Sequence, residues 1–324
     1  MHLVRLTALS LLLLLLPSAA WAQQVRWQPE RTRVVIVGVL SWQDPSITTF
    51  PAQERKDQEL YETLLRRGVP AGNISLLLDS QATRENILAT LAAQAAATKR
   101  EETFIFYYAG HGVKGTRGIE FVPYDFQGGA TGLSMEQILT TLQPLQSELT
   151  LLFADCCFSG GLAQVAQALE SDGRRAASLT SAGEENPSAS NWTFTISLLE
   201  GLNGYAAADR DQNGAVTLDE IAIEVAEAML YHEDQENGVA ERPWFSDLVM
   251  ATSFPLDRSL VPGVDRFDYV RFQNPDLSWE TGRVIDLRDG NFVVEVQEYS
   301  SRREVQVVPP GPSQNGNPPE PTGD

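Results

Sequence analysis

Two short apolar segments of the sequence end at residues that can do nucleophilic chemistry. The run Thr103–Tyr108 is followed by His111, and the run Thr150–Ala154 is followed by Cys156 and Cys157. The chain has only three histidines and two cysteines, so a histidine and a cysteine pair that each follow a short apolar run indicate a shared role. Short apolar runs of this kind are typical of buried parallel strands, and chemistry in open α/β sheets lies at the carboxyl ends of such strands. A Cys/His nucleophilic enzyme is therefore the first hypothesis.

The surrounding sequence alternates strand and helix patterns, which predicts an α/β fold. We expect further strands where other apolar runs occur, at 34–40, 74–78 and 177–181. Helical periodicity covers 53–67, a second helix begins after Thr83, and a capping box of Ser134 and Gln137 begins a third. Strands that alternate with helices form a mostly parallel sheet with helices on both faces.

The first 22 residues predict export. They combine an early basic residue, an apolar run from Leu9 to Leu16 and an Ala20-Trp21-Ala22 end, which is the pattern of a cleaved signal peptide. The apolar run is too short to favour a membrane-spanning helix, so an uncleaved anchor is the weaker alternative and no stable membrane insertion is expected. We expect a secreted or periplasmic protein.

The charge and the cysteines exclude two other interpretations. The net charge of −19 argues against nucleic acid as a partner, because phosphate binding needs clustered Lys and Arg. The two cysteines are adjacent in the chain, and neighbours rarely reach the geometry of a relaxed disulfide. Both are therefore expected to be free thiols.

The domain plan has five parts. After the signal peptide at 1–22, the catalytic domain is expected over 30–254 and a Pro- and Gly-containing linker over 255–266. Short β runs over 267–308, with a hairpin turn at Asp289-Gly290, resemble a small SH3-like or Tudor-like barrel. Residues 309–324 are rich in Pro, Gly and Asn, which is typical of a disordered tail. The sequence leaves open whether the β module binds a peptide, a cell-wall component or the catalytic domain.

The motif YYAGHG, followed by D-x-C-x-S-G, resembles the caspase-like cysteine peptidases, in particular the metacaspase and bacterial caspase-like branch. Cys157 follows His111 by 46 residues, close to the spacing of about 50 in caspases. The resemblance extends over residues 32–251. It implies a caspase-like α/β fold and protein or peptide substrates.

The resemblance also implies a role for each motif residue. Cys157 would be the nucleophile, although the doubled cysteine leaves Cys156 as an alternative. His111 would exchange the proton, and the backbone amides of Gly112 and Cys157 would bind the oxyanion. Asp155 would line the pocket for the residue before the cut bond, which predicts cleavage after Arg or Lys.

A separate twelve-residue segment that begins at Asp209 matches an EF-hand loop. Glycine stands at its sixth position, where the loop must turn sharply. The predicted ligands all offer an oxygen atom to Ca²⁺: Asp209, Asp211, Asn213, the carbonyl of Ala215, and Glu220. The alternative is an acidic turn that caps the following helix without a metal. If Ca²⁺ binds, a structural or an activating role is open.

Two rival functions remain at this point. A caspase-like domain can be a catalytically silent binding or scaffold protein, but the Cys/His pair is intact here. A legumain-like or gingipain-like peptidase of other specificity would use the same pair, and substrate profiling separates it. Arg174-Arg175 follows the cysteine strand and is a potential site of self-cleavage by a basic-specific enzyme, although paired arginines are more often part of a solvated loop.

Overall fold

The computed structural model describes residues 25–53, 55–170, 174–186, 191–205, 208–233, 235–240 and 242–253, together with four strands between 269 and 305. The predicted signal peptide, linker, Asp289-Gly290 turn and C-terminal tail lie outside the described residues. None of the described helices is long and apolar enough to cross a bilayer.

A six-stranded sheet forms the centre of the larger domain, in the order β11-β9-β8-β4-β2-β3. Its five parallel strands match the predicted ones: β2 (Thr32–Gly38), β3 (Ile74–Leu78), β4 (Thr103–Ala109), β8 (Leu149–Asp155) and β9 (Arg175–Thr180). The short strand β11 (Gly238–Val239) adds an antiparallel edge. Strands β4 and β8 are buried along their whole length, as expected for central parallel strands covered on both faces.

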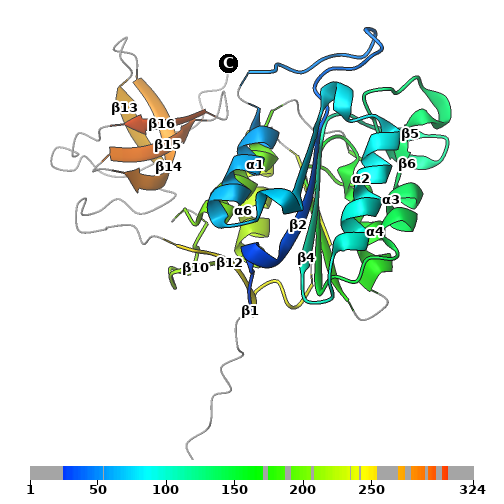
Figure 1. Ribbon diagram of the computed structural model, residues 1–324. Coiled ribbons are helices and arrows are strands. Elements are labelled where there is room, and N and C mark those ends of the chain that lie inside the picture. Colours follow the sequence, from blue (N-terminus) through cyan, green and yellow to red (C-terminus); the bar gives the residue numbers. More distant parts are fainter. Residues whose placement is uncertain are drawn as a thin grey trace, which may run out of the picture.

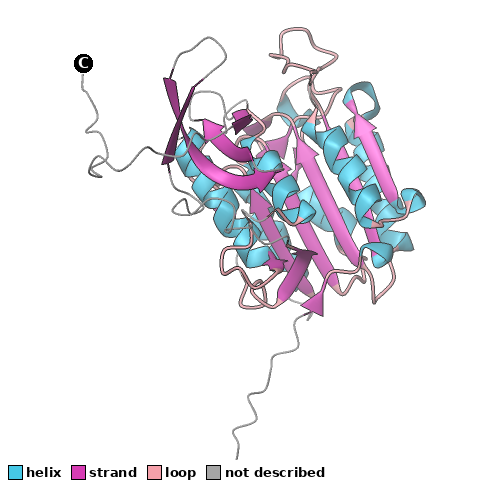
Figure 2. Ribbon diagram, turned by 90° about the vertical axis from the view of Figure 1, so that its left-hand side faces the viewer, coloured by secondary structure: helices cyan, strands magenta, loops and turns pink. Residues whose placement is uncertain are grey.

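Among the described residues, helices α1 to α6 cover the two faces of this sheet (Figures 1 and 2). One face carries α1 (Lys56–Arg67), α5 (Thr193–Asn203) and α6 (Leu218–Glu233), and the other carries α2 (Arg84–Ala97), α3 (Met135–Leu142) and α4 (Leu162–Glu170). Alternate residues of each strand supply the two cores. In β2, for example, Val34 and Ile36 face one core while Val35 and Val37 face the other. The predicted mostly parallel sheet with helices on both faces is confirmed.

Local signals account for several helix boundaries. Thr83 accepts a hydrogen bond from the Asn86 amide at the start of α2, and the predicted capping box of Ser134 and Gln137 is present at the start of α3. Gly68 ends α1 with a φ of 104°, a left-handed conformation that suits glycine.

The predicted start of the first helix is wrong by three residues. The periodicity indicated a helix from Gln53, whereas α1 begins at Lys56. Arg55 stands before the helix and its guanidinium contacts the carboxylates of Asp57 and Asp79, at 2.6 and 2.5 Å. The ion pair with Asp79 and a hydrogen bond to the Gly38 carbonyl oxygen tie the end of the preceding loop to the carboxyl ends of β3 and β2, so the segment before Lys56 belongs to the loop.

Two small sheets were not predicted, because each of their strands has only two to five residues. A hairpin sheet contains β5 (Gly112–Gly115), β6 (Gly118–Phe121) and β7 (Leu133–Ser134) and follows His111 directly. A second sheet joins β1 (Val25–Arg26), β12 (Leu248–Thr252) and β10 (Ala215–Thr217) in the order β1-β12-β10. It brings together segments from both ends of the domain (Figure 1).

The C-terminal strands form an antiparallel meander. Strands β13 (Tyr269–Gln273), β14 (Trp279–Arg288), β15 (Asn291–Val296) and β16 (Ser301–Val305) pair in chain order. Val284 and Val294 are opposite each other in β14 and β15, and both are buried. The meander agrees with the predicted short β runs, while closure into an SH3-like barrel stays a prediction.

Candidate active site

The register of the central sheet brings the histidine and cysteine segments to one edge. Gly38, Ala109 and Asp155 are the aligned last residues of β2, β4 and β8. The amide of Gly110 donates to the carbonyl oxygen of Asp155 at 3.3 Å, so the two chain segments stay together beyond the strands. His111 and Cys157 therefore both follow strands that end at the carboxyl edge of the sheet, as the apolar runs before them predicted.

The backbones of Gly112 and Cys157 are in direct contact. A Cβ atom on Gly112 would lie 2.0 Å from the carbonyl oxygen of Cys157 and 3.3 Å from the Sγ atom of Cys156. Real Cβ atoms do not approach an oxygen so closely, so only glycine fits here. The second glycine of the GHG motif thus has a steric reason: Gly112 lets the His111 segment and the Cys157 segment approach each other.

The His111 ring is held by a loop that the sequence did not point to. The loop between β2 and α1 passes over the ring, and the Nε2 atom lies 2.7 Å from the carbonyl oxygen of Thr48. Trp42 stacks on the ring with a centroid distance of 4.5 Å, and Phe50 packs at a tilt with a distance of 4.4 Å. A carbonyl can only accept, so Nε2 carries a proton, and in the neutral ring the lone pair is then on Nδ1. This tautomer can receive a thiol proton at Nδ1.

The two cysteines have different surroundings. Cys156 is 3% exposed and belongs to the core that α2, α3 and α4 cover. Burial, followed by the neighbouring Cys157 and Asp155, raises the pKa of the Cys156 thiol well above its ordinary value. Cys157 is half-buried. Since the thiolate is the nucleophile, these environments favour Cys157 over Cys156.

The residues after Cys157 hold a tight turn against the end of β9. Ser159 donates to the carbonyl oxygen of Ala182 at 3.3 Å and accepts from its amide at 3.1 Å. A Cβ atom on Gly160 would lie 2.6 Å from the backbone of Gly183. The Ser159-Gly160 part of the motif therefore positions the turn that carries the cysteine.

Asp155 is the buried last residue of β8, and its side chain forms hydrogen bonds with hydroxyl groups. Its Oδ2 atom accepts from Thr195 of α5 at 2.5 Å, and the Thr195 hydroxyl lies 2.6 Å from the Tyr107 hydroxyl. Since the Thr195 proton goes to Asp155, Tyr107 donates to Thr195. Burial raises the pKa of the Asp155 carboxyl to about 7, against the opposing effect of the hydrogen bonds from Thr195 and Ser181.

The arginine that contacts the carboxyl end of β2 already has acidic partners. Arg55 contacts Asp57, Asp79 and the carbonyl oxygen of Gly38, and no described ion pair joins a basic side chain to Asp155. A buried carboxyl whose pKa is raised by desolvation gains most from a cation that enters with a ligand.

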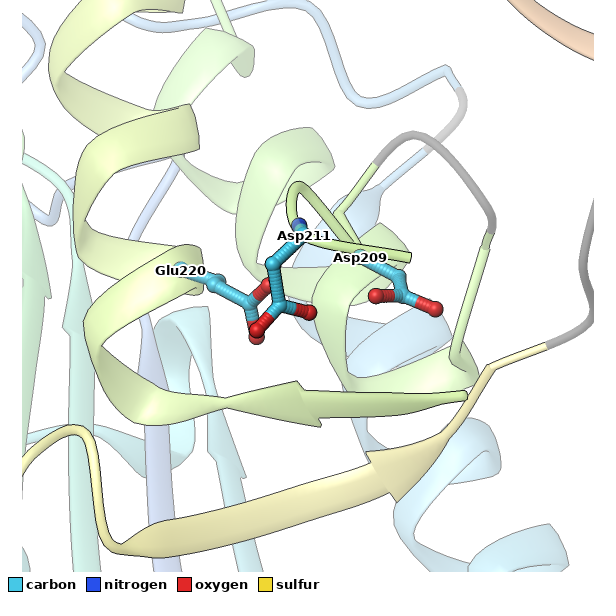
Figure 3. A group of neighbouring side chains, drawn as sticks. All are labelled: Asp209, Asp211 and Glu220. Carbon is cyan, nitrogen blue, oxygen red and sulfur yellow. The ribbon is translucent and has the colours of Figure 1, made fainter. Parts of the chain in front are cut away.

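The acidic loop has the geometry of a cation site. Asp209, Asp211 and Glu220 each present a carboxylate oxygen, and these oxygens lie within 4.8 Å of one another (Figure 3). Ligands on opposite sides of one Ca²⁺ ion are about 5 Å apart, since each bond is about 2.3–2.6 Å. Gly214 has a φ of 86°, which the sharp turn requires. These three residues fit the predicted Ca²⁺ loop. The Asn213 side chain accepts a hydrogen bond from the Ala215 amide, and Asn213 and Ala215 remain predicted ligands.

Sequence reasoning missed four residues that support the site: Trp42, Thr48, Phe50 and Thr195. Three lie in the loop before α1, and Thr48 acts through its carbonyl, which every residue type has. Thr195 is far along the chain from Asp155, so no local pattern indicates the contact. Two other polar residues have local structural roles instead. Asp125 accepts from the Arg84 amide at the start of α2, and Arg175, of the Arg174-Arg175 pair, is the first residue of β9.

The fold and the site together define an α/β protein that carries a histidine segment and a half-buried cysteine at the same edge of its central sheet. In comparisons with known proteins, the family description "Caspase domain" of the C14 peptidases matches residues 54–254. The chain therefore belongs to the caspase domain family. A crystal structure of protein GSU0716 from Geobacter sulfurreducens is similar at 14% identity and a TM-score of 0.49, over 69% of this chain and 100% of that chain. A search of curated proteins finds no match.

Proposed function

We propose that this protein is a cysteine endopeptidase that uses a Cys157/His111 dyad and cleaves after Arg or Lys. The observation that carries the proposal is the His111 ring, whose Nε2 atom is held by the Thr48 carbonyl while its backbone neighbour Gly112 touches Cys157. A nucleophile, a base and a third group that orients the base form the usual arrangement for covalent catalysis.

The reaction is acyl transfer. The Cys157 thiol gives its proton to Nδ1 of His111, and the sulfur attacks the peptide carbonyl carbon. The carbon–nitrogen bond then breaks, and the imidazolium returns the proton to the leaving amine. Water cleaves the resulting thioester and restores the thiol. The oxyanion formed at each attack would accept from the amides of Gly112 and Cys157, and one such donor is typically worth about 3 kcal/mol.

The preference for Arg or Lys follows from the Asp155 environment. The carboxyl is buried at the carboxyl edge, has hydroxyl partners and lacks a basic partner among the described ion pairs. A guanidinium or ammonium group of the substrate would supply the missing counter-charge. Hydrogen bonds to charged groups contribute about 1.5–3 kcal/mol, enough to select the residue before the cut bond.

Asp155→Asn tests this specificity, since it keeps the shape and removes the charge. We expect KM for an Arg or Lys peptide to rise about 10- to 100-fold, and Asp125→Asn to leave KM unchanged. In the wild type, KM should fall as the pH rises from about 6 to 8, because the Asp155 carboxyl loses its proton near pH 7. Fluorogenic peptides that end in Arg, Lys, Asp or Asn give the measurement. A preference for Asp or Asn would contradict the assignment and favour a legumain-like specificity.

We also propose that the loop from Asp209 to Glu220 binds Ca²⁺. The three clustered carboxylates and the left-handed Gly214 support this. A bound ion would brace the start of α6 and strand β10, which pairs with β12. Bracing α6 and β10 does not require the ion to touch the peptide substrate. We therefore propose a structural or activating role for Ca²⁺.

Titration with CaCl₂ in a calorimeter tests the loop. We expect a binding heat and a higher melting temperature for the wild type, and neither for Asp209→Asn. Asp219→Asn is the matched control, because it removes a carboxylate from the same loop that does not belong to the cluster. The absence of any heat with the wild type would overturn the Ca²⁺ proposal without touching the peptidase proposal.

Export after cleavage behind Ala22 stays part of the proposal. The cleavage would leave β1 intact, since Val25 and Arg26 pair with Leu248 and Val249 of β12. N-terminal sequencing of the protein from culture medium or periplasm tests it, and an N-terminus upstream of Gln23 would contradict it.

A further inference from the structure

We propose that Trp42 and Phe50 form an aromatic corner that positions His111 and stabilises the positive charge which its ring acquires during catalysis. The inference rests on the proposed Cys/His function and adds two positioning residues to it. Neither side chain belongs to the motifs that identify the family.

The ring distances define the shape of this corner. The centroid of His111 lies 4.5 Å from that of Trp42, with 27° between the ring planes, and 4.4 Å from that of Phe50, with 46°. The centroids of Trp42 and Phe50 are 5.8 Å apart. A sandwich would place them nearly 9 Å apart by these distances, so the rings enclose His111 from two adjacent sides. Trp42 offers the stacked face, and Phe50 braces both of the other rings.

Hydrogen bonds that do not involve the His111 ring attach the corner to the protein. The Trp42 Nε1 atom donates to the carbonyl oxygen of Val122 at 3.1 Å, and the Phe50 amide donates to the carbonyl oxygen of Leu40 at 2.9 Å. Asp79 accepts from the amides of Leu40 and Ser41 at 2.8 and 3.2 Å. Trp42 is only 7% exposed. The aromatic rings are therefore in place before the histidine takes its proton.

This arrangement supplies what the Thr48 carbonyl alone does not. One hydrogen bond at Nε2 leaves the ring free to turn about that contact, whereas a stacked face fixes its plane. When the ring takes the thiol proton it becomes a cation, and the face of an aromatic ring attracts a cation, with indole as the strongest of the aromatic side chains. The attraction is larger for the imidazolium than for the neutral ring, so it favours the thiolate–imidazolium pair.

Three variants separate positioning by an aromatic face from simple packing. Trp42→Leu removes the face, Trp42→Phe keeps a face but loses the hydrogen bond to Val122, and Phe50→Leu removes the brace. The Val122 oxygen retains the Tyr108 hydroxyl as a donor at 2.9 Å. The readouts are kcat and KM on the best peptide substrate and the rate at which iodoacetamide alkylates Cys157, measured in a Cys156→Ala background. Alkylation reports the thiolate, because the thiolate is the reactive species.

We expect Trp42→Leu to lower kcat and the alkylation rate about tenfold each, with KM changed less than about twofold. Trp42→Phe should recover most of both rates, and Phe50→Leu should lower them about threefold. Equal rates for Trp42→Leu and Trp42→Phe, or a Trp42→Leu effect confined to KM, would overturn the inference. If Trp42→Leu does not fold, the Phe50→Leu variant tests the proposal instead, since Phe50 is only half-buried. An unchanged kcat and an unchanged alkylation rate in that variant would overturn the proposal.

The failure of the proposed function is a different result. It would be a folded wild type that cleaves no peptide and whose Cys157 alkylation is the same in His111→Ala. Failure of the aromatic corner alone would leave the wild type active and dependent on His111.

Discussion

Replacing Cys157 by alanine is expected to abolish peptide cleavage, whereas Cys156→Ala should keep most of it. The two thiols are neighbours in the chain, but the structure separates them by environment. Cys156 lies in the core, and burial raises its pKa well above the ordinary value, so it carries little thiolate at neutral pH. Cys157 is half-buried on the turn that contacts Gly112. Loss of a nucleophile typically costs about 10⁴-fold or more in kcat.

The two variants control for each other, because each removes one sulfur atom and the two positions are adjacent in the chain. Cleavage of the best Arg or Lys peptide gives the rates, and mass spectrometry after iodoacetamide treatment identifies the thiol that reacts first. Loss of cleavage in Cys156→Ala with retention in Cys157→Ala would reverse the assignment. Folded variants and a folded wild type that are all inactive would favour the scaffold function, in which the domain binds partners without cutting them.

Gly112→Ala is expected to lower kcat/KM by about 10²-fold or more, although only one methyl group is added. That methyl would lie 2.0 Å from the Cys157 carbonyl oxygen, so the His111 and Cys157 segments must move apart. A displacement of about 1 Å between reacting groups can cost about 10²-fold in rate. The Gly112 amide would move with the chain and lose its position as a proposed oxyanion donor. Forced overpacking should also lower the free energy of unfolding by about 1–3 kcal/mol.

Gly72→Ala is the matched control for this substitution. Gly72 has no heavy atom within 4 Å of the position that a Cβ would take, so its variant should keep both activity and stability. Kinetics on the same peptide and thermal unfolding followed by circular dichroism give the comparison. Wild-type kcat/KM in Gly112→Ala would contradict the close approach on which the site geometry depends.

The sequence alone predicted the parts of this protein that local patterns encode. Runs such as Thr103–Tyr108 are apolar because a central parallel strand is covered on both faces, and Ser134 with Gln137 indicates a helix start through a contact three residues away. The paired motifs around His111 and Cys157 indicated the caspase family, which the match over residues 54–254 confirms. The clustering of Asp209, Asp211 and Glu220 was also predictable, since these residues come from one short segment, and Ca²⁺ binding there stays a prediction.

Only the tertiary structure decided which groups surround the reactive residues. The Thr48 carbonyl that holds His111 has no residue-type signature, and Trp42 and Phe50 read as ordinary apolar residues of a loop. The Thr195 contact with Asp155 depends on how α5 packs over the sheet, and the difference between Cys156 and Cys157 depends on which one faces the core that α2, α3 and α4 cover. Sequence periodicity reports a residue's own strand or helix, whereas contacts between distant segments arise from strand order, register and helix packing.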